Sequence, residues 1–133
     1  MPFVLDSVAL LAHLGDEAGA ARVREVLTSC RSGLEVGYMT EINIGETLYI
    51  TERERGTAEA ARVLGLIDQL PLTQVPATRP QILAAAHIKA QAPISYADAF
   101  VVAAAREFSA TILTGDHEFE SVEAGVEVEW LPG

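Results

Sequence analysis

Residues 95–116 read SYADAFVVAAAREFSATILTGD, and this stretch decides the fold. Residues 95–109 predict a helix, because Asp98 opens an almost uninterrupted apolar run at helical length. The short apolar run over 110–113 then predicts a buried strand, which Asp116 follows after two residues. A helix that leads directly into a short buried strand is typical of a parallel sheet covered by helices.

The rest of the chain repeats this alternation. We expect further strands over 3–6, 34–39, 73–76 and 126–131, and further helices over 7–14, 17–31, 41–55, 57–70, 80–91 and 117–122. Gly56 separates two of these helices, which predicts a helical hairpin. The pattern predicts one domain over residues 1–133, an α/β/α sandwich around a mainly parallel, roughly five-stranded sheet.

Composition limits the class of protein. Half of the 133 residues are hydrophobic and 21% are charged, which is typical of a globular chain. A single cysteine, Cys30, excludes an internal disulfide framework and a zinc site with several cysteines. The N-terminus lacks basic residues, and no apolar run approaches the ~18 residues of a membrane span. We therefore expect a cytoplasmic protein without a targeting segment.

The charge balance constrains any role with nucleic acids. The formal net charge is −10, and the last eighteen residues, from Asp116 on, contain six acids and no Lys or Arg. An acidic surface opposes the phosphate contacts on which non-specific nucleic-acid binding depends. A nucleic-acid function would have to use metal ions, a few arginines or a basic partner.

Four acids stand in apolar stretches, where carboxylates are costly to bury: Asp6, Glu46, Asp98 and Asp116. Asp6 and Asp116 follow predicted strands, and Asp98 lies in the first turn of the helix before the fourth strand. Glu46 is placed by helical spacing on a largely apolar face. Sites in parallel α/β sheets form beyond the carboxyl ends of the strands, so we expect the four acids to meet there.

Helix capping is an alternative explanation for three of these acids. Asp6 and Asp116 are possible N-caps of the helices that follow them. Ser95 and Asp98 have the spacing of a capping box. Glu46 lies in mid-helix and cannot be a cap, and its alternative is a partly exposed position at the helix edge. Capping and metal binding are compatible, so both interpretations stay open.

Converging carboxylates have a definite chemistry. They repel one another, so some must be protonated or recruit a cation. Oxygen ligands favour Mg²⁺ or Mn²⁺. One or two such ions could activate a water and stabilise the leaving oxygen in phosphodiester hydrolysis.

Four motifs together resemble the PIN-domain family, and specifically the VapC-type toxins of toxin–antitoxin pairs. They are Val4-Leu5-Asp6-Ser7, Asn43-Ile44-Gly45-Glu46, Ser95-Tyr96-Ala97-Asp98-Ala99-Phe100 and Thr114-Gly115-Asp116-His117-Glu118-Phe119. No single motif is specific. Their order and spacing along the whole of a short chain carry the resemblance.

The resemblance implies a function and a set of site residues. Asp6, Glu46, Asp98 and Asp116 match the family's acidic quartet around Mg²⁺ or Mn²⁺. The hydroxyl residues Ser7, Ser95 and Thr114 match positions that support those acids. The implied activity is metal-dependent cleavage of single-stranded or looped RNA. The implied partners are a small antitoxin of the VapB type, which blocks the site through a basic segment, and a second copy of the chain in a homodimer.

Two residues after Asp116 need separate interpretation. His117 stands where the family often has proline, and we interpret it as an exposed residue at a helix start rather than a catalytic one. Glu118 has two open interpretations, an extra metal contact or part of a solvated face.

The sequence leaves other functions open as alternatives. A PIN-like module could bind RNA or an antitoxin without cutting, and a nuclease of this type could process RNA outside a toxin–antitoxin pair. A phosphatase or phosphoacceptor domain could use Asp6 as its nucleophile. Val8 argues against a haloacid-dehalogenase type, which needs a second Asp at that position. A receiver-like domain would want a lysine late in the chain, and the only lysine is Lys89.

Overall fold

The computed structural model describes residues 1–122 and 125–132, which are built around a parallel sheet of five strands. The strands are β1 (Pro2–Leu5), β2 (Val36–Thr40), β3 (Thr73–Val75), β4 (Thr111–Thr114) and β5 (Val128–Trp130). Their order is β3-β2-β1-β4-β5, and every neighbouring pair is parallel. The helices are α1 (Ser7–Leu14), α2 (Ala20–Arg31), α3 (Glu41–Arg55), α4 (Thr57–Gln69), α5 (Arg79–Gln91), α6 (Tyr96–Phe108) and the 3₁₀ helix η1 (His117–Ser121).

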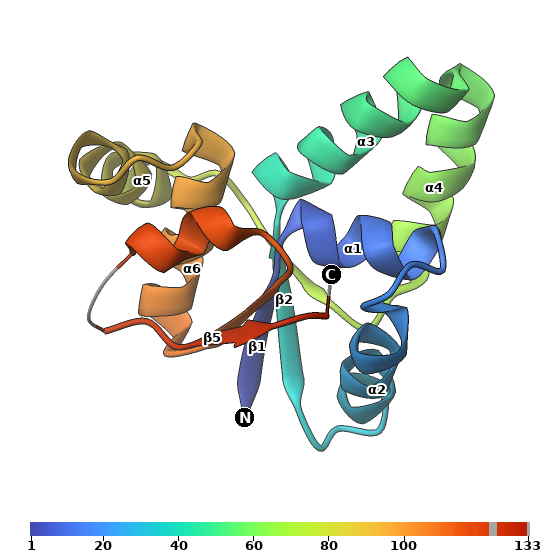
Figure 1. Ribbon diagram of the computed structural model, residues 1–133, viewed down its shortest axis with the longest axis horizontal. Coiled ribbons are helices and arrows are strands. Elements are labelled where there is room, and N and C mark those ends of the chain that lie inside the picture. Colours follow the sequence, from blue (N-terminus) through green and yellow to red (C-terminus); the bar gives the residue numbers. More distant parts are fainter. Residues whose placement is uncertain (123–124, 133) are drawn as a thin grey trace.

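Helices cover both faces of the sheet (Figure 1), and the two faces have separate cores. Successive residues of a strand point to opposite faces. Val4 belongs to the core under α5 and α6, whereas Phe3 and Leu5 belong to the core under α1 and α2. The prediction of an α/β/α sandwich is therefore confirmed, with a sheet that is parallel throughout the described strands.

The α3–α4 hairpin forms a separate arm in Figure 1, where it extends past α1. Gly56 joins the two helices with a φ of 90°, a left-handed conformation that favours glycine. A third core cluster fixes the hairpin to α1 and β2 through Leu10, Met39, Ile44, Val63 and Ile67. The hairpin thereby carries Glu46 toward the end of β1.

Several element boundaries differ from the sequence expectations. The second strand begins at Val36 rather than residue 34, because the N–H groups of Leu34 and Glu35 both donate to the Ser29 carbonyl at the end of α2. The last strand is Val128–Trp130 rather than 126–131, because its partner β4 has only four residues. Strand ends depend on the partner strand, which local sequence does not reveal.

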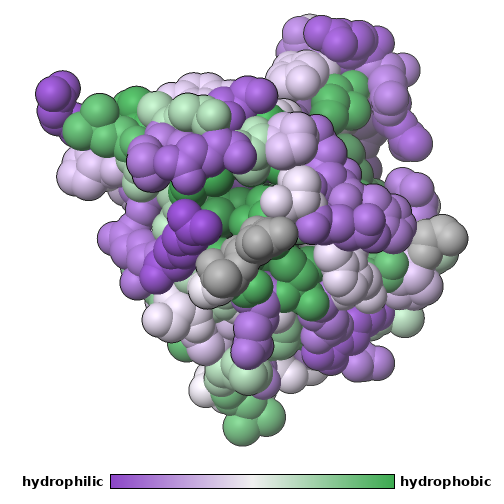
Figure 2. Space-filling model, turned by 60° about the vertical axis from the view of Figure 1, so that its left-hand side comes forward, coloured by the Kyte–Doolittle hydropathy of each residue, from purple (hydrophilic) through white to green (hydrophobic). Residues whose placement is uncertain are grey.

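The surface mixes polar and hydrophobic side chains. Figure 2 shows hydrophilic side chains spread over much of the face that it presents, with hydrophobic ones between them. Among the described helices, none combines the length and the apolar character that crossing a bilayer requires.

Candidate metal centre

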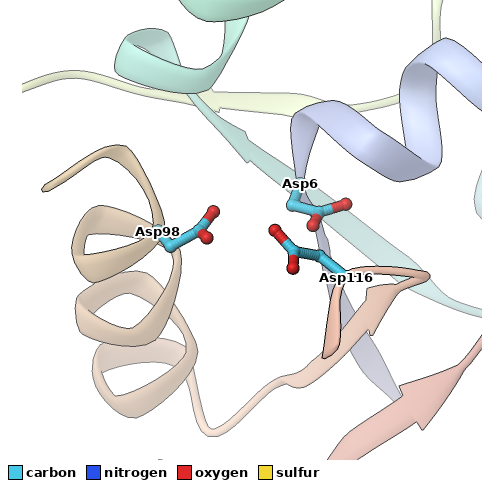
Figure 3. A group of neighbouring side chains, drawn as sticks. All are labelled: Asp6, Asp98 and Asp116. Carbon is cyan, nitrogen blue, oxygen red and sulfur yellow. The ribbon is translucent and has the colours of Figure 1, made fainter. Parts of the chain in front are cut away.

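Three of the predicted acids meet at the carboxyl ends of β1 and β4. One carboxylate oxygen from each of Asp6, Asp98 and Asp116 lies within 4.8 Å of the other two. Figure 3 shows the three side chains pointing toward one another from the start of α1, from α6 and from the segment after β4. β1 and β4 are adjacent at the point where the chain reverses its direction of strand addition, which is where α/β sheets usually bind ligands.

Asp6 is held on both of its carboxylate oxygens. The Ala9 N–H donates to Asp6 Oδ1 at 2.8 Å, so Asp6 caps α1. The Thr114 hydroxyl donates to Asp6 Oδ2, and the same hydroxyl oxygen accepts the Asp116 N–H at 2.9 Å. Thr114 and Asp6 are both fully buried. One threonine on β4 thus connects the first acid to the last.

Asp116 and Asp98 each lie at the start of a helix. Asp116 caps η1, since its Oδ1 accepts the Glu118 N–H at 2.9 Å. Asp98 forms one half of the expected capping box, because its N–H donates to Ser95 Oγ at 3.1 Å. Its carboxylate points to the other two aspartates instead (Figure 3). Capping and convergence are therefore combined in one arrangement.

The site disfavours negative charge in the absence of a cation. Burial raises the pKa of Asp6 from its ordinary 3.8 to about 7; the hydrogen bonds from Thr114 and Ala9 lower it, and the charges of Asp116 and Glu46 raise it further. Burial also raises the pKa of Asp98, and Glu118, Asp116 and Asp6 add to that effect. The neighbouring charges that act on both acids are negative. An all-oxygen set with excess negative charge fits a hard divalent cation such as Mg²⁺ or Mn²⁺.

Glu46 lies beside this group rather than in it. The hydroxyl of Ser7 donates to Glu46 Oε1, and the charge of Glu46 contributes to the raised pKa of Asp6. Three of the four predicted acids therefore form the compact set, and the fourth adjoins Asp6 through Ser7.

Every supporting residue predicted from the sequence contacts or influences one of these acids. Thr114 bonds to Asp6, Ser7 to Glu46, and Ser95 to the backbone of Asp98, while Glu118 raises the pKa of Asp98. The role of each in binding a metal stays a prediction.

Asn43 has a role that sequence reasoning missed. It is fully buried on α3, and its Nδ2 donates to the Ala97 carbonyl at 3.3 Å. This bond ties the helix of Glu46 to the first turn of α6, next to Asp98. The signal in the sequence is an amide between two isoleucines, Ile42 and Ile44.

The sequence matches a known protein family over most of its length. The model of the PIN domain family matches residues 3–125. The chain belongs to the PIN domain family. The resemblance seen in the four sequence motifs is thereby confirmed. Among curated proteins, none matches the sequence significantly.

Solved structures of VapBC toxin–antitoxin proteins have the same fold. VapBC2 of Rickettsia felis, bound to a DNA fragment from its promoter, matches with a TM-score of 0.76 and 12% identity, covering 99% of this chain and 100% of that one. Mycobacterium tuberculosis VapC20, a toxin that cleaves the sarcin–ricin loop, also has a TM-score of 0.76, with 18% identity and coverage of 98% and 99%. DNA-bound VapBC of Salmonella typhimurium has a TM-score of 0.74, with 20% identity and 97% coverage of both chains.

Proposed function

We propose that this protein is a Mg²⁺- or Mn²⁺-dependent endoribonuclease that acts as the toxin of a toxin–antitoxin pair. The observation that carries the proposal is the set of three aspartates, drawn from three separate elements, with carboxylate oxygens within 4.8 Å of one another. Membership of the PIN domain family and the structural similarity to VapC20, a toxin that cleaves the sarcin–ricin loop, support it.

In the proposed site, Asp6, Asp98 and Asp116 would hold the metal ion. A bound divalent cation would supply an activated water and stabilise the charge on the leaving oxygen. Thr114 keeps Asp6 oriented, and the raised pKa values of Asp6 and Asp98 mean that protons leave these groups as the ion binds. Glu46, which adjoins Asp6 through Ser7, would add a further negative charge beside the ion.

The proposed substrate is single-stranded or looped RNA. The net charge of −10 makes broad electrostatic capture of RNA unfavourable, so the phosphate to be cut would be drawn mainly by the bound cation. Accessible phosphates in unpaired segments suit such a site better than those of a regular duplex.

The proposed partner is a small antitoxin with a basic segment, and we propose action as a homodimer in the cytoplasm. Structurally similar proteins include VapBC pairs. A groove of about 330 Å³ is lined by Val8, Leu11, Gly115 and Leu131, among others. Val8 is two residues from Asp6, and Gly115 precedes Asp116, so a peptide in this groove would lie beside the segments that carry two of the acids. A basic residue at its end would supply the positive charge that the site lacks.

Expression of the wild type and the Asp98→Asn variant tests the proposal. We expect the wild type to arrest growth and to produce new RNA ends, and the purified protein to cut the same sites only with Mg²⁺ or Mn²⁺. Asp98→Asn should do neither. The matched control is Asp68→Asn, the same change at an exposed aspartate on α4, which should behave like the wild type.

Two results would contradict this proposal. A wild type that is harmless and leaves no metal-dependent cuts would indicate a binding module. An Asp98→Asn variant as toxic as the wild type would show that the assigned site is wrong. A short neighbouring reading frame for a basic, DNA-binding-like protein would favour a toxin–antitoxin role over stand-alone RNA processing.

A further inference from the structure

An aromatic pair lies beside the candidate metal centre. The rings of His117 and Trp130 are stacked, with centroids 5.5 Å apart and planes inclined by 10°. His117 directly follows Asp116, and Trp130 on β5 pairs in register with Thr114, whose hydroxyl binds Asp6. The pair is thus adjacent to Asp116 in sequence, and it is adjacent in the sheet to Thr114, which binds Asp6.

This stack is exposed, unlike the other stacked pair in the described residues. The side chain of His117 is 77% exposed, and Trp130 is 40% exposed. The rings of Tyr38 and Phe108, 4.1 Å apart, pack against the core beneath α5 and α6. Because the His117 ring is largely exposed to solvent, the stack leaves an aromatic surface available for a third ring.

The charges around the pair select what can bind. His117 Nδ1 is 2.7 Å from Glu120 Oε1, so an acid lies directly beside the imidazole ring. Glu118 and Asp116 are also close in sequence, and residues 116–133 contain no Lys or Arg. Phosphate would be repelled at such a surface. A neutral planar ring would not, and base–aromatic stacking needs no charge.

We propose that His117 and Trp130 form a stacking platform for one unpaired nucleobase of the RNA substrate, next to the phosphate that is cut. This inference rests on the nuclease function proposed above. A nucleotide joins its base to its phosphate through a single sugar, so a phosphate held at the aspartates brings a neighbouring base to the adjacent rings. Because every base has a π face, the platform fixes the position of the strand more than its sequence.

The single tryptophan of the chain provides a direct readout, since Trp130 is the only source of tryptophan fluorescence. A short single-stranded RNA, chosen from the sites that the wild type cuts or, if none is cut, an unstructured RNA, is mixed rapidly with the wild-type protein and Mg²⁺, and the Trp130 fluorescence is recorded before cutting begins. We expect quenching by this RNA, weaker quenching when one nucleotide beside the cut is abasic, and little quenching by the same sequence as a duplex.

Substitutions test the platform through kinetics. His117→Ala and Trp130→Leu should each lower kcat/KM by roughly 5- to 150-fold, mostly through KM, which corresponds to about 1–3 kcal/mol per stacked base. His117→Phe and Trp130→Phe should retain most of the wild-type value, because they keep an aromatic face. The control is Leu34→Ala, which truncates an exposed hydrophobic residue outside the site and should leave kcat/KM unchanged. Circular dichroism checks that each variant is folded.

The outcomes separate this inference from the nuclease proposal. If the wild type cuts RNA but both truncations retain wild-type kcat/KM and the abasic RNA quenches fully, the platform is wrong and the nuclease stands. If no RNA is cut but quenching depends on the base, the platform stands as an RNA contact and the nuclease proposal fails.

Discussion

Carboxylates in two neighbouring regions of this protein have opposite environments. On β5, the Glu129 carboxylate accepts hydrogen bonds from Arg22 Nε at 2.6 Å and Nη2 at 2.9 Å, and this arginine lowers the pKa of Glu129. At the ends of β1 and β4, burial raises the pKa of Asp6 to about 7 and also raises that of Asp98. The difference is a cation within the chain. Glu129 has one, whereas the charges acting on Asp6 and Asp98 are negative.

The two kinds of carboxylate affect the stability of the protein differently. A carboxylate whose folded-state pKa lies above its unfolded value costs stability once the unfolded chain has lost the proton. A surface ion pair such as Arg22–Glu129 adds little to the free energy of unfolding, because solvent screens it. The aspartates are therefore arranged at the expense of stability, as expected for a site that receives its positive charge from a ligand.

The largest effect should come from removing a carboxylate of the three-aspartate set. Asp6→Asn or Asp116→Asn should reduce metal-dependent RNA cleavage by at least about 100-fold, because both metal binding and charge stabilisation are lost. Glu129→Gln should stay within about twofold of the wild type, since Arg22 already neutralises that acid. Initial rates on a labelled RNA at saturating Mg²⁺ give both values. Equal losses in the two regions would refute the assignment.

The pH dependence of stability should separate the two regions next. Folded Asp6 keeps its proton to about pH 7 while the unfolded chain releases it near 3.8, so without metal the free energy of unfolding should fall as pH rises through this window. The raised pKa of Asp98 extends the fall beyond it. Mn²⁺ at 100 times its Kd at pH 8 should add about 2.7 kcal/mol, or roughly 10 °C in Tm, at that pH, and the same Mn²⁺ concentration should add much less at pH 5.

Calorimetric Tm measurements at both pH values provide the check. Asp98→Asn should flatten the pH dependence, raise the metal-free Tm at pH 8 and reduce the response to Mn²⁺. Glu129→Gln should keep the full response to Mn²⁺. A wild-type Tm that rises between pH 5 and pH 8 without metal would contradict the expected direction of this pH dependence.

A smaller effect is expected from the hydroxyl that orients Asp6. Thr114→Val keeps the shape of the side chain but removes the donor, and it should weaken metal affinity by about 10- to 100-fold. Ser7→Ala should weaken it less, because Ser7 contacts Glu46 rather than the three aspartates. Thr73→Val on the exposed part of β3 is the matched control. Titration calorimetry with Mn²⁺ would expose the idea as wrong if Thr114→Val bound normally.

The smallest effect should follow from breaking the ion pair itself. Arg22→Ala should cost about 1 kcal/mol or less, a few degrees in Tm, because both side chains are partly exposed. The cost should shrink further in 1 M salt, where exposed charges are screened. Thermal unfolding at low and high salt measures it, and a cost above about 2 kcal/mol would show that the pair has a structural role.

Local pattern was sufficient to predict most of the elements. The apolar run after Asp98 predicted α6, and the short run after it predicted β4, each within a residue at either end. The boundaries of β2 and β5 were less accurate because partner strands determine them. Acids in apolar stretches were enough to predict that Asp6, Asp98 and Asp116 would meet.

Contacts between distant segments were beyond local pattern. Glu46 was expected to join the other three acids, but it lies outside their compact set. The packing of α3 against α1 and β2 determines how far Glu46 lies from the aspartates. His117 was interpreted as an exposed residue, which it is, but its stacking on Trp130 depends on the pairing of β5 with β4.

The amino-acid sequence by itself determined that strands alternate with helices and that acids follow two of those strands, since periodicity and the cost of burying charge act over a few residues. Only the tertiary structure decided that β1 lies next to β4. That choice places the Thr114 hydroxyl on Asp6 across 108 positions of sequence and gathers the aspartates at one edge. Strand order and register result from packing the whole chain, and they bring together carboxylates on which the neighbouring charges are negative.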